Sequence, residues 1–122
     1  MTTQGKDGGI ARHGVTARWA DKVVHNGTVY LVEVPATTTA DIGVQTAEVL
    51  ASIERQLAEV DSDKSRLLMA TIYLKDFADA PAFNAVWEAW LPAGCAPARA
   101  CVRAELADPG YRIEIALTAA LR

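Results

Sequence analysis

The sequence has 122 residues, of which 51% are hydrophobic, and this length and composition fit one globular domain better than a disordered segment. Twelve basic and fifteen acidic side chains give a net charge of −3, and neither sign forms a block that could follow a phosphate backbone, which argues against a nucleic-acid partner. No apolar run is long enough to span a bilayer and residues 1–9 lack an apolar signal-peptide core, so we expect one cytoplasmic domain over residues 1–122, with residues 1–14 polar and weakly ordered.

The first predicted element is a β-hairpin. Residues 17–25 carry few helix signals, and Asn26-Gly27 is a dipeptide that tolerates positive φ at both central positions of a tight turn. Residues 28–34 are rich in β-branched and aromatic side chains, which favour a strand. Pro35 cannot donate a hydrogen bond to a sheet, so we expect the second strand to end there.

A long amphipathic helix follows the hairpin. The threonines at 37–39 offer hydroxyl caps, and the helix is expected to end near Val60. The following residues, all apolar except Thr46, recur at a spacing of three and four residues, which places them on one helix face: Ile42, Thr46, Val49, Leu50, Ile53, Leu57 and Val60. Residues 67–74 (LLMATIYL) are a nearly continuous apolar run that is too short for a typical helix, so we predict a buried strand.

A second helix and a closing pair of strands complete the chain. Asp79 is a candidate N-cap with Pro81 in the first turn, and Pro92 with Gly94 should end the helix. Its apolar stripe comprises Phe83, Val86, Trp87, Trp90 and Leu91. The segments 98–106 and 111–121 are predicted strands, joined by the turn signal Asp108-Pro109-Gly110.

The predicted order is therefore ββαβαββ. Strands on both sides of two helices indicate an α+β fold, in which a mixed sheet carries both helices on one face. This chain has no further helix to cover the other face, so we expect that face to mediate association between copies.

The residue types that usually hold metals give no support for a metal site. Cys95 and Cys101 are six residues apart, without a CxxC spacing, and we expect both to be reduced thiols. His13 and His25 have no Cys or carboxylate partner at a recognisable ligand spacing.

The most informative stretch is residues 96–102 (APARACV), followed by Tyr111-Arg112-Ile113-Glu114-Ile115. A PxRxxV pattern, a turn and a strand carrying Ile-Glu-Ile resemble the signature of the RidA (YjgF-like) family, which also carries the label endoribonuclease L-PSP. The resemblance extends over residues 18–122, and Arg18-Trp19 with residues 87–90 (WEAW) are most similar to its YoaB-like branch. It implies a chorismate-mutase-like fold, a homotrimer with sites between subunits, a small carboxylate as substrate, and no metal or cofactor.

The resemblance assigns roles to two residues of this sequence. Arg99 would bind the substrate carboxylate, a role that suits a planar guanidinium, which donates two parallel hydrogen bonds and stays charged at any working pH. Glu114 would orient or deprotonate the water that attacks an imine carbon, a step that needs such a group. The alternative for both is a structural one. Arg99 would then form an ion pair or lie on a solvated face, and Glu114 would pair with a basic residue across the sheet.

Three further residues are weaker candidates for substrate binding. Cys101 is two residues after Arg99, so in a strand it points to the same face and would line the same pocket. Neither histidine is near it in sequence to act as a base, so we do not expect it to be a nucleophile. Asn84 matches an asparagine that opens the equivalent family helix, and Trp19 falls near an aromatic that covers the ligand there; the alternatives are a helix-surface amide and a core indole.

One segment departs from the family pattern. Well-known members carry a Ser-Gly pair at the end of the second strand, where this chain has Leu31, Val32 and Glu33. If Glu33 faced the Arg99 pocket, its carboxylate would repel an anionic substrate. This difference predicts an altered or lost family activity.

The reaction that the resemblance implies is hydrolytic deamination. A 2-imino acid, formed from the enamine that pyridoxal-phosphate-dependent dehydratases release, would yield a 2-oxo acid and ammonia. One alternative is a regulatory module that binds a small carboxylate without turnover. RNA cleavage or inhibition of translation is disfavoured by the acidic balance, and a chorismate-mutase-like isomerase would need more cations around a dicarboxylate.

Overall fold

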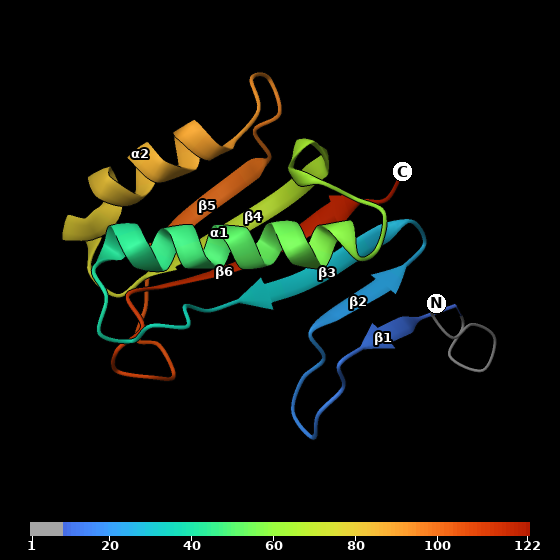
Figure 1. The fold of residues 1–122 in the computed structure, drawn as a ribbon, viewed down its shortest axis with the longest axis horizontal. Helices are drawn as coiled ribbons and strands as arrows, with labels where there is room; N and C mark the ends of the chain where they lie inside the picture. The colour runs from blue at the N-terminus through green and yellow to red at the C-terminus, as the bar shows by residue number, and fades with distance from the viewer. Residues whose placement is uncertain (1–8) are drawn as a thin grey trace.

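A computed structural model describes residues 9–122, which form a six-stranded sheet with two helices packed on one face (Figure 1). The strands are β1 (Ala11–His13), β2 (Lys22–His25), β3 (Thr28–Glu33), β4 (Leu67–Leu74), β5 (Ala98–Arg103) and β6 (Ile113–Ala120). The helices are α1 (Ile42–Ala58) and α2 (Ala80–Trp90), and two single-turn 3-10 helices, η1 (Lys64–Arg66) and η2 (Phe77–Asp79), precede β4 and α2. Within residues 9–122, no helix is long and apolar enough to cross a membrane.

The strands lie in the order β1-β2-β3-β6-β4-β5. Only β4 and β5 are parallel among the neighbouring pairs of this described sheet, so the sheet is mixed and the α+β class is confirmed. The predicted element order lacked β1, which occupies part of the segment expected to be weakly ordered. Three residues are too short to show a strand periodicity, and β1 is fixed by its pairing with β2, where His13 lies opposite Lys22. Residues 1–8 of that segment lie outside the described residues.

The Asn26-Gly27 hairpin is confirmed. Asn26 has φ 51° and Gly27 has φ 75°, the positive pair that a two-residue turn requires to match the twist of its strands. The strand before it is shorter than expected and begins at Lys22. Residues 16–19 instead form a turn, in which the Thr16 hydroxyl accepts hydrogen bonds from the backbone N–H groups of residues 18 and 19.

The cap of α1 differs from the prediction. Asp41, and not one of the threonines at 37–39, is the N-cap: its Oδ1 accepts from the Val44 N–H at 2.9 Å. Thr37 serves a different purpose, because its hydroxyl donates to Glu48 Oε2 at 2.6 Å and holds the incoming loop against the helix.

The two faces of the sheet differ in what covers them. Along β6, alternate residues from Ile113 to Ala119 are buried under the helices, and the intervening ones are half-buried on the opposite, open face. Figure 1 shows α1 over β6 and β3, and α2 toward the β5 edge. The open face presents exposed large apolar side chains on three strands: Tyr30, Val32, Met69 and Val102.

Candidate functional site

Arg99 lies on the β5 edge strand, on the face that carries the helices, because its register partner on β4 is the buried Ala70. Its Nη1 donates to Asn84 Oδ1 on α2 at 3.0 Å. Its Cζ lies 5.7 Å from the ring centre of Phe83 and 6.0 Å from that of Trp87. The electron-rich faces of these rings favour a cation at this distance, so α2 fixes the guanidinium both by a hydrogen bond and by its aromatic residues.

A pocket of about 360 Å³ adjoins this guanidinium, a volume at the small end of the range for small-molecule sites. Its walls come from the outer face of α2, from the loop before β5 and from Arg99 itself, and comprise Asn84, Trp87, Glu88, Leu91, Ala96, Pro97 and Arg99. Apart from Arg99, the charged wall residue is Glu88. The arrangement suits a small ligand with a carboxylate on Arg99 and an apolar part against Trp87 and Leu91.

Neither Trp87 nor Glu88 was predicted from the sequence to line the site. Both line the pocket because they follow Asn84 by three and four residues on α2 and therefore share its helix face. That spacing was present in the sequence, but the apolar stripe suggested only a core role for Trp87. The Trp87 indole has both roles. It belongs to the core, where it is buried and lies 5.8 Å from Phe83 between ring centres, and it also lines the pocket.

Cys101 lies on the same face of β5 as Arg99, as the strand spacing predicts. Its side chain packs against the hydrophobic core and is not among the residues that line the Arg99 pocket. Cys95 is in the loop before β5, and both cysteines are free thiols. Among the residues that the structure describes, no three His, Cys, Asp or Glu side chains gather as metal ligands.

Glu114 is not brought to the Arg99 pocket within one chain. It lies opposite Tyr73 in the β6–β4 pairing, between the buried Ile113 and Ile115, and so it points to the open face. Arg99 is two strands away and on the helix face. A single subunit therefore presents the two candidate catalytic residues on opposite sides of its sheet.

Trp19 and Glu33 are also remote from Arg99. Trp19 is 61% exposed in the loop between β1 and β2, at the sheet edge opposite β5. Glu33 ends β3 on the helix face, where its Oε2 accepts from Gln56 Nε2 at 3.1 Å. Strands β6 and β4 separate Glu33 from β5, so its carboxylate does not face the Arg99 pocket of its own chain.

Comparison with known sequences gives a consistent picture. Residues 10–121 match the family model described as endoribonuclease L-PSP. The chain is 46% identical to the RutC family protein YoaB of Escherichia coli (strain K12) over 112 residues, which cover 92% of this chain and 98% of that protein. It is 35% identical to the 3-aminoacrylate deaminase RutC of Acinetobacter baylyi over 107 residues, covering 86% of this chain and 84% of that one.

A solved structure has the same fold. A member of the YjgF protein family from Neisseria meningitidis superposes with a TM-score of 0.88 and 47% sequence identity, over 93% of this chain and 95% of that one.

Proposed function

The chain belongs to the endoribonuclease L-PSP family, together with its RutC- and YjgF-named relatives, and from that premise we propose that it is a deaminase of small 2-imino or enamine carboxylic acids. Water adds to the carbon of the C=N bond, the nitrogen departs as ammonia, and a 2-oxo acid remains. The substrates of this proposal are 2-iminopropanoate and 2-iminobutanoate. The relative named as a 3-aminoacrylate deaminase supports the reaction class.

The observation that carries the proposal is the guanidinium of Arg99 at the wall of a pocket of about 360 Å³. Asn84 holds one of its nitrogen atoms, and the rings of Phe83 and Trp87 lie beside it, so the fork is oriented before a ligand arrives. An oriented guanidinium binds a carboxylate through two parallel hydrogen bonds. The pocket therefore suits a substrate that is a short carboxylic acid.

Activation of water requires a second group, and we assign this role to Glu114. Because Glu114 and Arg99 of one chain lie on opposite sheet faces, the proposal needs Glu114 to reach the pocket from another subunit. Glu114 then accepts a proton from the attacking water and returns it to the departing nitrogen.

The open sheet face supports an assembly of this kind. It carries Tyr30, Val32 and Met69, which are between 41% and 53% exposed, and a shallow apolar pocket of about 370 Å³. Contiguous exposed apolar surface usually marks an interface. We propose that three copies associate through this face, with one site between each pair of subunits.

The deciding experiment generates 2-aminoacrylate or 2-aminocrotonate with a dehydratase and measures the release of ammonia. Wild-type protein should accelerate release over buffer, and an Arg99→Ala protein should not. Equal rates for wild type, variant and buffer would remove the deaminase proposal.

A second candidate is a carboxylate-binding module without turnover. The observation that favours it is the absence of Glu114 from the Arg99 pocket within the described chain. Binding and turnover together distinguish the two candidates. A binding module should bind 2-oxobutanoate through Arg99 and should lose this binding in Arg99→Ala. Neither the wild type nor the variant should then change the rate of ammonia release.

A further inference from the structure

Three neighbouring strands each place one cation at the same end of the sheet. Lys75 directly follows β4, Arg103 ends β5, and Arg112 directly precedes β6. The strand pairing brings them together, because Leu74 lies opposite Arg103 and the Lys75 N–H donates to the Arg112 carbonyl at 3.1 Å. All three line one pocket of about 600 Å³, together with residues 38–40, Asp76, Asp79 and the turn at 109–110.

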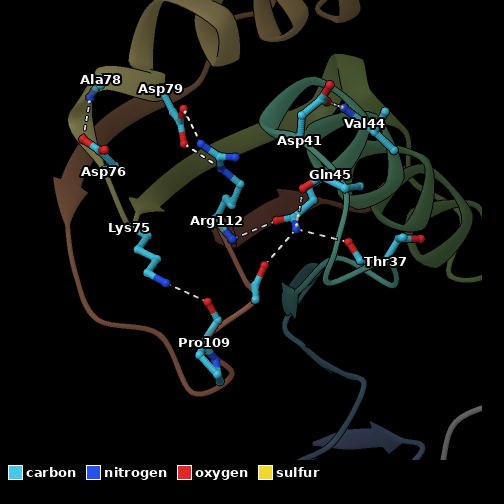
Figure 2. Close-up of polar contacts among 12 residues, drawn as sticks. Thr37, Asp41, Val44, Gln45, Lys75, Asp76, Ala78, Asp79, Pro109 and Arg112 are labelled. Atoms are coloured by element: carbon cyan, nitrogen blue, oxygen red, sulfur yellow. Dashed lines mark hydrogen bonds and ion pairs between the residues drawn. The ribbon is translucent and has the colours of Figure 1, made fainter.

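The wall of this pocket is fixed by part-buried polar contacts, which Figure 2 shows. Asp79 sits at the N-cap position of α2, yet its carboxylate makes no cap bond and instead accepts from Arg112 Nε and Nη2, at 3.1 Å each. Gln45, fully buried on α1, accepts from the Arg112 N–H at 2.8 Å and donates to the Gly110 and Thr37 carbonyls.

Two further contacts close the loops around the pocket. Lys75 Nζ donates to the Pro109 carbonyl at 2.6 Å. A Cβ on Gly110 would lie 2.5 Å from the Cβ of Thr38, so only glycine lets the 109–110 turn approach the 38–40 loop this closely. The pocket is therefore shaped before any ligand enters, which lowers the entropic cost of binding.

The cations keep hydrogen-bonding capacity that the wall does not use. Within residues 9–122, the side chain of Arg103 forms no ion pair or hydrogen bond, and it is exposed. Lys75 spends one donor on Pro109, and Arg112 keeps its Nη1 free of Asp79. Arg112 neutralises Asp79. Among the described residues, the other pocket carboxylate, Asp76, has no cation partner, and its Oδ1 accepts from the Ala78 N–H. Three cations against two carboxylates give this pocket a net charge of +1, in a chain whose net charge is −3.

We propose that this pocket binds a phosphate monoester. Lys75, Arg103 and Arg112 reach the pocket from three strand ends, and Thr38 and Thr39 line a fourth side. A phosphate monoester presents three terminal oxygens in different directions, where a planar carboxylate presents only two. The volume exceeds that of a phosphate ion and leaves room for the esterified group. The pocket shares no wall residue with the Arg99 pocket, and Arg103 is four residues, or roughly 13 Å, further along β5. The proposal does not rest on the deaminase function.

Isothermal titration of the full-length protein with methyl phosphate, inorganic phosphate and malonate tests it. Methyl phosphate and inorganic phosphate should bind, and malonate should bind more weakly. Arg103→Ala should weaken phosphate binding by about tenfold, because it removes a charge-assisted hydrogen bond whose donor has no structural partner. Asp76→Asn keeps a capping side chain and removes the repelling charge, so it should tighten binding.

Two controls locate the site. Arg99→Ala alters the other pocket, and Arg18→Ala removes an exposed arginine from the loop between β1 and β2; both should bind phosphate as wild type does. In amide NMR spectra, phosphate should shift the signals of residues 38–40 and 110–112. Equal binding by wild type and Arg103→Ala, equal affinity for malonate and methyl phosphate, or loss of binding in Arg99→Ala would each overturn the proposal.

Discussion

Arg99 and Glu114 lie on opposite faces of the same sheet, with β4 between their strands. Both are candidates for one hydrolytic reaction, in which a single water has to be close to both the bound carboxylate and the general base. Within one subunit the sheet itself separates them. If both act on one substrate, they must come from different subunits.

Mixed assemblies of Arg99→Ala and Glu114→Gln chains should therefore recover activity that neither variant has alone. In a randomly mixed trimer, about a quarter of the sites combine an intact Arg99 with an intact Glu114 of the neighbouring chain. Co-expression with two affinity tags isolates the mixed species for the ammonia-release assay. Each variant purified alone is the control, and mixed assemblies as inactive as their parents would contradict the arrangement.

Substitutions of Arg99 should separate charge from geometry. Arg99→Ala should lower kcat/KM by about 100-fold, and Arg99→Lys by about tenfold, because lysine keeps the charge but loses the bidentate fork. Asn84→Ala should act more weakly, by about fivefold and mainly through KM, since it removes one hydrogen bond that orients the guanidinium. The thermal midpoints of the two Arg99 variants should stay near the wild-type value because Arg99 is exposed.

The open sheet face should be the surface that holds copies together. Val32 lies on β3 and is 53% exposed on this open face. Val32→Asp places a charge in the apolar contact, so it should convert an oligomer into a monomer. Val44→Asp is the matched control, because Val44 is 48% exposed but lies on α1, on the other side of the molecule. Light scattering at micromolar concentration measures both, and a monomeric wild-type protein would refute the assembly.

The sequence pattern predicted most of the fold because its signals were local and redundant. The Asn26-Gly27 turn, the apolar run of β4 and the stripe of α2 each depend on neighbouring residues, and all three are present. Strand β1 could not be predicted in the same way, because three residues show no periodicity and depend on pairing with β2.

The site was only partly predictable for a related reason. Arg99 and Asn84 meet because α2 packs beside β5, which is a contact between residues 15 positions apart. The family resemblance named both as candidates for substrate binding but did not predict the hydrogen bond between them. The separation of Glu114 from Arg99 follows from strand order and register, which a motif does not encode. The expected cap by Asp79 was wrong in its chemistry, since Arg112 competes for the same carboxylate and offers a bidentate partner.

Gln45 should be among the polar residues on which stability depends most. Gln45→Leu removes the partner of the Arg112 N–H and of the Ala40 and Gly110 carbonyls, while the Thr37 carbonyl keeps the Ala40 N–H. We expect a loss of about 3 kcal/mol in the free energy of unfolding. Urea unfolding followed by circular dichroism measures it.

The adjacent Thr46 is the matched control for that substitution. It is also fully buried on α1, but within the described chain its hydroxyl has no hydrogen-bond partner. Thr46→Val replaces an unsatisfied polar group with a methyl group of similar shape, so it should leave the protein as stable or up to about 1 kcal/mol more stable. Comparable losses in the Gln45 and Thr46 variants would mean that helix packing, not the hydrogen bonds of Gln45, sets the cost.

Acid should lower the free energy of unfolding in two steps, and both steps involve groups around Lys22 at the β1–β2 edge. The buried Lys22 Nζ donates to Gln56 Oε1 at 2.7 Å and to Glu59 Oε1 at 2.6 Å. Burial, and then the charge of Lys22 opposite it, lowers the pKa of His13 below 6.5. The unfolded chain therefore takes up this proton first, and stability should fall as the pH drops from about 7 toward the lower, folded pKa.

The second step belongs to Glu59. The hydrogen bond from Lys22, and then the positive charge of Lys22, lower the pKa of Glu59. A carboxyl group with a depressed folded pKa stabilises the fold above its unfolded pKa, and this contribution is lost as the pH falls through the folded value. Urea midpoints between pH 3 and pH 8 should show both steps. His13→Gln should flatten chiefly the upper step and Glu59→Gln chiefly the lower one, because each group also acts weakly on the pKa of the other. His25→Gln is the control for loss of an imidazole. If both variants followed the wild-type curve, the Lys22 cluster would have no part in the acid response, and the loss of stability would have to arise from the exposed carboxylates elsewhere on the chain.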